Sequence, residues 1–76
     1  MESNTAPRLA RLRSLMSTGA AKSIRLAAGV SLPEIARDVG VAHSTVYRWE
    51  NDLNVPKGDP ALRYAAVLDE LSGVSS

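Results

Sequence analysis

The sequence predicts an all-α fold. Apolar residues recur at helical spacing in five short segments, and Gly and Pro stand between these segments. The alternation of β-branched residues that is typical of strands is absent, and Ala, Leu and Arg, which favour helices, dominate the composition. With 76 residues, the chain has room for one small domain.

The N-terminal segment predicts a short amphipathic helix with a basic face. Pro7 suits the first turn of a helix. The apolar positions are Leu9, Leu12, Leu15 and Met16, and the basic positions, mostly on the other side, are Arg8, Arg11 and Arg13. We expect residues 1–17 to form a basic arm or helix beside a domain of residues 18–73.

A second apolar stripe follows the small polar break at residues 17–19 and ends at Gly29. We expect Ser17 or Thr18 to cap this helix. A continuous helix across Gly19 would cost only about 1 kcal/mol. Whether residues 7–28 form one helix or two therefore stays open.

The stretch from Ser31 to Asp52 predicts two helices joined by a tight turn. Ser31 is an N-cap candidate, with Pro33 in the first turn and Glu34 placed to complete a capping box. Gly40 suits the left-handed residue that ends a helix, and Val41 restarts the apolar pattern at once. Two helices around such a turn are typical of a helix-turn-helix unit, which reads DNA with its second helix.

The second helix of this unit has two different sides. Trp49, Ala42 and Leu53 cluster beside Val46 on a helical wheel, and we expect this side to be buried. The opposite side carries groups that hydrogen-bond to bases or phosphates, with Arg suited to guanine and Asn to adenine. These residues are Ser44, Tyr47, Arg48 and Asn51, with His43 and Thr45 at the margins.

Glu50 lies near the buried direction of the same helix and needs a cation. Arg25, between the apolar Ile24 and Leu26, is one candidate partner, and two unrelated exposed charges are the alternative.

A turn-rich connection leads to the last predicted helix, with Asp59 as its cap, Pro60 in its first position and Gly73 near its end. This helix is apolar on more than one face, which favours a second copy of the chain as partner. The positions off its main face, and hence our predicted dimer interface, are Leu62, Ala66 and Val67.

Composition excludes several classes of site. The chain has no Cys and one His, so disulfides, thiolate nucleophiles and Cys-based or His-rich metal sites are excluded. We expect no metal, no cofactor, no small-molecule ligand and no enzymatic activity. The apolar runs are too short for a membrane span and the N-terminus lacks signal-peptide features, so we expect a cytoplasmic protein.

The formal net charge of +1 is unevenly distributed. Residues 1–33 hold five cations and one anion, whereas residues 34–76 hold four cations and seven anions. Residues 31–52 themselves hold two cations and four anions, which is unfavourable for binding phosphates. We therefore expect the N-terminal cations to attract DNA, through Arg8, Arg11, Arg13 and Lys22, with Arg25 as a further phosphate contact.

Residues 18–71 resemble the phage repressor and Cro type (Xre-like) helix-turn-helix family. The likeness rests on Glu34-Ile35-Ala36, Gly40-Val41, Ser44-Thr45-Val46, Arg48-Trp49-Glu50 and Pro56. It implies a lambda-repressor-like bundle of about five short helices, here with an additional N-terminal helix. The resemblance also implies an ion pair between Arg25 and Glu50.

Carried over by position, the resemblance implies base contacts by His43, Ser44 and Arg48, with Thr45 and Tyr47 at the sugar-phosphate edge. It implies phosphate contacts by Asn51, Asn54 and Lys57. Three departures stand out: Leu32 replaces a frequent Gln, Ala42 replaces a capping Ser or Thr, and Asp52 replaces a frequent Gly.

We therefore expect a sequence-specific, DNA-binding transcriptional regulator of repressor or Cro type, which binds a double-stranded operator as a homodimer in a prokaryotic host cell, in association with the nucleoid. An antitoxin and an excisionase-like factor share this motif and stay open. A protein-interaction module that has lost DNA reading is the alternative from another class, favoured by the low net charge and by Leu32 and Asp52.

Overall fold

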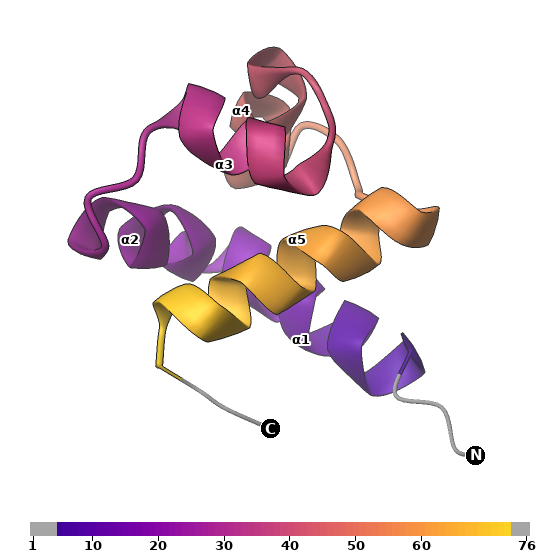
Figure 1. Cartoon of the computed structure of the whole chain (residues 1–76). Coiled ribbons are helices and arrows are strands. Elements are labelled where there is room, and N and C mark those ends of the chain that lie inside the picture. Colours follow the sequence, from indigo (N-terminus) through magenta and orange to yellow (C-terminus); the bar gives the residue numbers. More distant parts are fainter. Residues whose placement is uncertain (1–4, 74–76) are drawn as a thin grey trace.

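The computed structural model describes residues 5–73, and within them the chain forms five α-helices and no strand. The predicted all-α bundle is thus confirmed. The first four residues of the predicted N-terminal arm lie outside the described part. The helices are α1 (Thr5–Ser17), α2 (Ala20–Ala27), α3 (Leu32–Val39), α4 (His43–Glu50) and α5 (Gly58–Leu71), arranged as in Figure 1.

The helix is interrupted between α1 and α2, so residues 7–28 form two helices. Gly19 adopts a left-handed conformation with φ 81° and is itself the N-cap of α2. The prediction of Ser17 or Thr18 as the cap was wrong, because Gly19 takes that position; the Thr18 hydroxyl donates to the Ser14 carbonyl at 2.9 Å and accepts from the Ala20 amide at 3.4 Å.

Local signals define α3 at both ends, as predicted. The Glu34 amide donates to the Ser31 hydroxyl at 3.2 Å, and the Ser31 amide donates to the Glu34 carboxylate at 2.8 Å. The bond from the Ser31 amide lowers the pKa of Glu34 below its ordinary value. Gly40 ends the helix at φ 86°, where an L-residue with a side chain would be strained.

One apolar core joins all five helices. Leu12 and Met16 of α1 are buried in it together with Ala21 of α2. The remaining large members come from α3, α4 and α5: Ile35, Val39, Val46, Trp49, Tyr64 and Leu68. The rings of Trp49 and Tyr64 lie 4.9 Å apart between centroids. Because α1 contributes two large side chains to this core, it belongs to the domain rather than forming a separate arm.

Two local predictions around α4 and α5 were wrong. Helix α5 begins at Gly58 with Lys57 as its N-cap, so Asp59 lies inside the first turn. A carboxylate in that turn interacts favourably with the helix dipole. Ala42 is exposed, and the side chain of Leu53 is 66% exposed instead of packing beside Val46. The chain leaves the helical path after Glu50, so the helical wheel no longer places Leu53 correctly.

Candidate nucleic-acid interface

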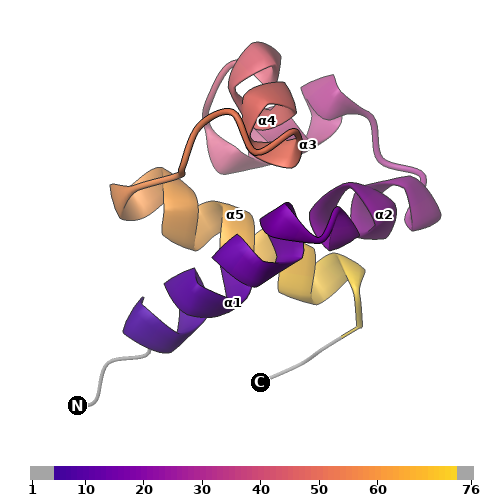
Figure 2. The same cartoon turned by 180° about the vertical axis from the view of Figure 1, so that it is seen from behind.

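Helix α4 turns a polar face to solvent. His43, Ser44, Tyr47 and Arg48 are exposed, with Tyr47 52% exposed, whereas Val46, Trp49 and Glu50 are buried against the rest of the bundle. Both views show α3 and α4 together at one end of the molecule and α1 at the other (Figures 1 and 2). The exposed side chains of α4 therefore point away from the body of the domain.

A buried ion pair fixes α4 to α2. The Arg25 Nε donates to Glu50 Oε2 at 2.5 Å and its Nη2 donates to Oε1 at 3.1 Å, while Nη1 donates to the Val30 carbonyl at 2.8 Å. Both residues are more than nine-tenths buried. The hydrogen bond to Glu50 raises the pKa of Arg25 above its ordinary value. This is the pair that the resemblance implied.

The same geometry corrects one predicted phosphate contact. All three nitrogens of the Arg25 guanidinium donate a hydrogen bond inside the protein, and the residue is 6% exposed. Because the guanidinium is buried, Arg25 is not placed to contact a DNA phosphate. Its role is to position α4.

The two ends of α4 differ from those of α3. Ala42 is the N-cap and supplies no side-chain hydrogen bond. At the other end, the Asn51 side-chain amide donates to the Tyr47 carbonyl at 2.8 Å, so part of its donor capacity is used within the helix. Asp52 then adopts φ 59°, the left-handed conformation for which Gly is the usual residue. Thr45 is half-buried on the side of α4 that faces the following loop.

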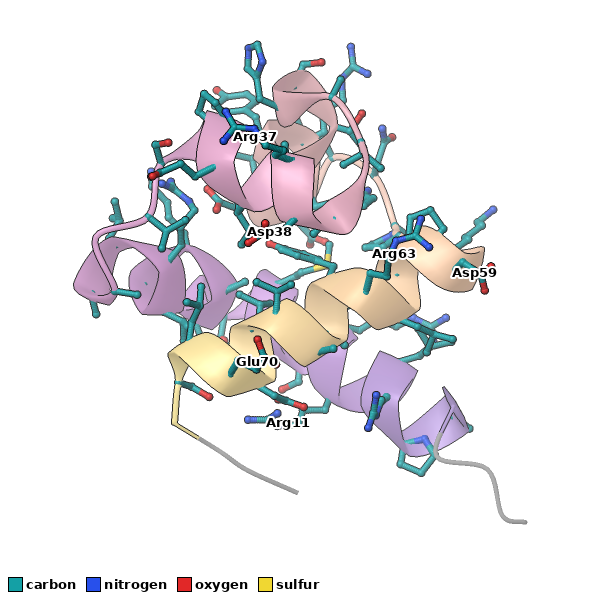
Figure 3. All side chains as sticks on the ribbon, in the orientation of Figure 1. Arg11, Arg37, Asp38, Asp59, Arg63 and Glu70 are labelled. Carbon is teal, nitrogen blue, oxygen red and sulfur yellow. The ribbon has the colours of Figure 1, made fainter. Side chains whose placement is uncertain are left out.

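Two arginines outside α4 were missed by the sequence analysis. Arg37 is exposed on α3, and Figure 3 shows it on the side of that helix away from α5. Arg63 of α5 donates from Nε to the Val39 carbonyl at 2.8 Å and packs against Gly40. Arg63 therefore ties α5 to the turn between α3 and α4, which no spacing within the motif could indicate.

The predicted basic residues of α1 come from a helix at the end of the molecule opposite to α3 and α4 (Figures 1 and 2). Helix α1 packs against α2 and α5, away from α4. Arg11 forms an ion pair with Asp69 of α5, so the positive N-terminal half meets the negative C-terminal half inside one domain. Arg8 is half-buried on α1, and Arg13 and Lys22 are exposed on α1 and α2.

The loop from Asn51 to Lys57 does lie beside α4, and it exposes both Asn54 and Lys57 (Figure 2). The residues of the predicted dimer interface, Leu62, Ala66 and Val67, are half-buried on α5, and Val67 packs against the core.

Among the helices of residues 5–73, none is long and apolar enough to cross a membrane. In the same part of the chain, His, Asp and Glu do not gather in groups of three that could hold a metal ion.

Comparison with known proteins identifies the motif. Searches of curated proteins and of solved structures find no significant match. A family profile described as helix-turn-helix matches residues 22–73, which covers α3, α4 and α5 and most of α2. Since this match spans more than half of the chain, and since α3, the turn at Gly40 and α4 have the expected form, the chain belongs to the Xre/Cro/lambda-repressor-like family of DNA-binding helix-turn-helix regulators.

Proposed function

We propose that this protein is a sequence-specific transcriptional regulator of repressor or Cro type, which binds an operator as a homodimer and reads the major groove with α4. The observation that carries the proposal is the exposed face of α4. It presents His43, Ser44, Tyr47 and Arg48 and no carboxylate, while the opposite face is held by buried contacts. A rigid helix with such a face suits direct reading of base edges.

The roles follow from exposure and position. Arg48, His43 and Ser44 contact base edges, and Thr45 and Tyr47 contact the sugar-phosphate edge. Arg37 on α3 and Asn54 and Lys57 after α4 contact phosphates, with Asn51 limited by its bond to Tyr47. Arg13 is left out of this set because α1 lies at the end of the molecule opposite to α4 (Figures 1 and 2).

The test compares two exposed arginines. Bound sites are selected from random duplex DNA with the full chain, and affinity for the selected site and for random DNA is then measured for Arg48→Ala and Arg13→Ala. We expect Arg48→Ala to reduce discrimination between the two DNAs by about 10- to 100-fold, the value of one bidentate base contact. Arg13→Ala should leave discrimination unchanged. Unchanged discrimination in Arg48→Ala would refute the proposal.

An antitoxin or an excisionase-like factor would use the same face of α4 in the same way. The genes beside the coding sequence distinguish these roles from a phage switch, because a toxin or an integrase reading frame would lie next to it. Each of these roles belongs to the cytoplasm of a prokaryotic cell.

A further inference from the structure

Tyr64 of α5 has a buried hydroxyl that forms no hydrogen bond with another residue of 5–73. The residue is fully buried, with an exposed fraction of 0%. Buried Tyr hydroxyls usually have a partner, because a hydroxyl that leaves water without one costs free energy. Phe would fill the same part of the core without this cost, so the hydroxyl needs a partner other than the protein.

The surroundings of this hydroxyl include the buried ion pair between α2 and α4. The Tyr64 ring packs against Trp49, the residue before Glu50, with 4.9 Å between the ring centroids. Burial raises the pKa of Tyr64, the negative charge of Glu50 raises it further, and the positive charge of Arg25 lowers it. Both charges therefore act on the hydroxyl, although neither residue forms a hydrogen bond with it.

The ion pair has hydrogen-bonding capacity that its protein contacts do not use. Nη1 and Nη2 of Arg25 each carry two N–H groups and each donates one hydrogen bond within residues 5–73, so each keeps a second N–H. Each Glu50 carboxylate oxygen accepts one bond from Arg25 and can accept another. The two side chains are 8% and 2% exposed, so bulk water hardly reaches them. Three neighbouring buried residues thus keep free donors or acceptors.

We infer that a single buried water molecule binds between Tyr64, Arg25 and Glu50 and joins α5 to the other two helices. This water accepts from a free Arg25 N–H, donates to a Glu50 oxygen and shares a hydrogen bond with the Tyr64 hydroxyl. About three hydrogen bonds are typical of a water molecule buried in a protein. Tyr64 is then a positioning residue for α4, because it acts through the water on the pair that fixes that helix.

The first test looks for the water directly. A crystal structure of the full chain at atomic resolution should show one water molecule within hydrogen-bonding distance of the Tyr64 hydroxyl and of Arg25 or Glu50. In solution, the hydroxyl proton of Tyr64 should show a nuclear Overhauser effect to a long-lived bound water. A hydroxyl that bonds directly to a protein atom, or a site without water, would overturn the inference.

The second test measures what the hydroxyl contributes to folding. Tyr64→Phe keeps the ring against Trp49 and removes only the hydroxyl. We expect the equilibrium constant for unfolding, measured by urea denaturation, to rise about fivefold, the usual effect of losing one hydrogen bond. Tyr47→Phe is the matched control, since Tyr47 is 52% exposed on α4, and it should leave the constant within about twofold. If the hydroxyl has no partner, Tyr64→Phe will stabilise the domain instead, and the inference is wrong.

The third test shows whether the hydroxyl acts on the ion pair. In the double variant Arg25→Met with Glu50→Leu, the water loses its charged partners. Tyr64→Phe made in this background should leave the unfolding constant unchanged or lower it, and the difference from its effect in the wild type measures the coupling. A rise as large as in the wild type would contradict the inference. Because these tests measure hydration and folding, their outcome does not depend on whether α4 binds DNA.

Discussion

The two helices of the motif differ in how their ends are stabilised. Helix α3 is defined by its own sequence, with a complete capping box at Ser31 and Glu34 and a left-handed Gly40 at its end. Helix α4 begins at an uncapped Ala42 and is followed by Asp52 in a conformation that suits Gly. Distant residues hold α4 instead: Arg25 bonds Glu50, and Tyr64 packs against Trp49.

This difference bears on what each helix depends on for its stability. A helix of eight residues is marginal by itself, so α4 depends on its buried side, formed by Val46, Trp49 and Glu50. Its outward positions are then available for DNA. Helix α3 has the same length and also buries one side in the core, but it has in addition the capping box that α4 lacks, and Arg63 attaches its end to α5.

Breaking the anchor of α4 should have the largest effect. Glu50→Ala leaves the Arg25 guanidinium buried without its partner, and we expect the free energy of unfolding to fall by about 3–5 kcal/mol. Urea denaturation measures this loss. The double variant Arg25→Met with Glu50→Leu should recover most of it, since no buried charge remains. A loss below about 1 kcal/mol, as for a surface pair, would contradict this role.

Removing the link from α5 should have an intermediate effect. Arg63→Ala takes away a charged donor from the Val39 carbonyl at the end of α3, and we expect a loss of about 1–2 kcal/mol in the free energy of unfolding. Arg37→Ala is the matched control, because exposed Arg37 should change stability by less than about 0.5 kcal/mol and weaken DNA binding instead. Denaturation and binding measured on both variants give the comparison. If the Arg63→Ala and Arg37→Ala variants are equally stable, the bond from Arg63 to Val39 contributes nothing to the stability of the domain.

Changing the N-cap residues of the two helices should have the smallest effect on stability. It tests the difference between α3 and α4 most directly. Ser31→Ala should destabilise the domain by about 1 kcal/mol, and Ala42→Ser should stabilise it by a similar amount, because a Ser hydroxyl accepts from a free amide at the helix start. The melting temperatures of the two variants test this pair of opposite shifts. If Ala42→Ser lowers the melting temperature, the start of α4 is not limited by its missing cap.

The sequence predicted those features that local chemistry determines. The capping box of α3, the turn at Gly40 and the buried Trp49 follow from spacing alone, and the two-sided character of α4 does too. The residues alone left the Arg25–Glu50 pair as one of two alternatives, and the family resemblance favoured it, since nothing local joins residues 25 positions apart.

Features that depend on where the chain goes after a helix ends were not predictable. Leu53 fits the wheel of α4 but lies beyond its last turn, so it is exposed rather than buried. The prediction that the basic residues of α1 contact DNA rested on charge along the sequence, which does not show that α1 lies at the end of the fold opposite to α4 (Figures 1 and 2). The bond from Arg63 to Val39 joins two helices whose sequences give no sign of it.

The burial of Leu12 and Met16 has a consequence for cooperativity of folding. The family match starts at residue 22, yet the unit that folds includes α1, which that match leaves out. The family match and the packed core therefore begin at different residues of this chain. The backbone amides at the centre of α1 should exchange with solvent only when the whole domain unfolds, with the same free energy of opening as those of α5.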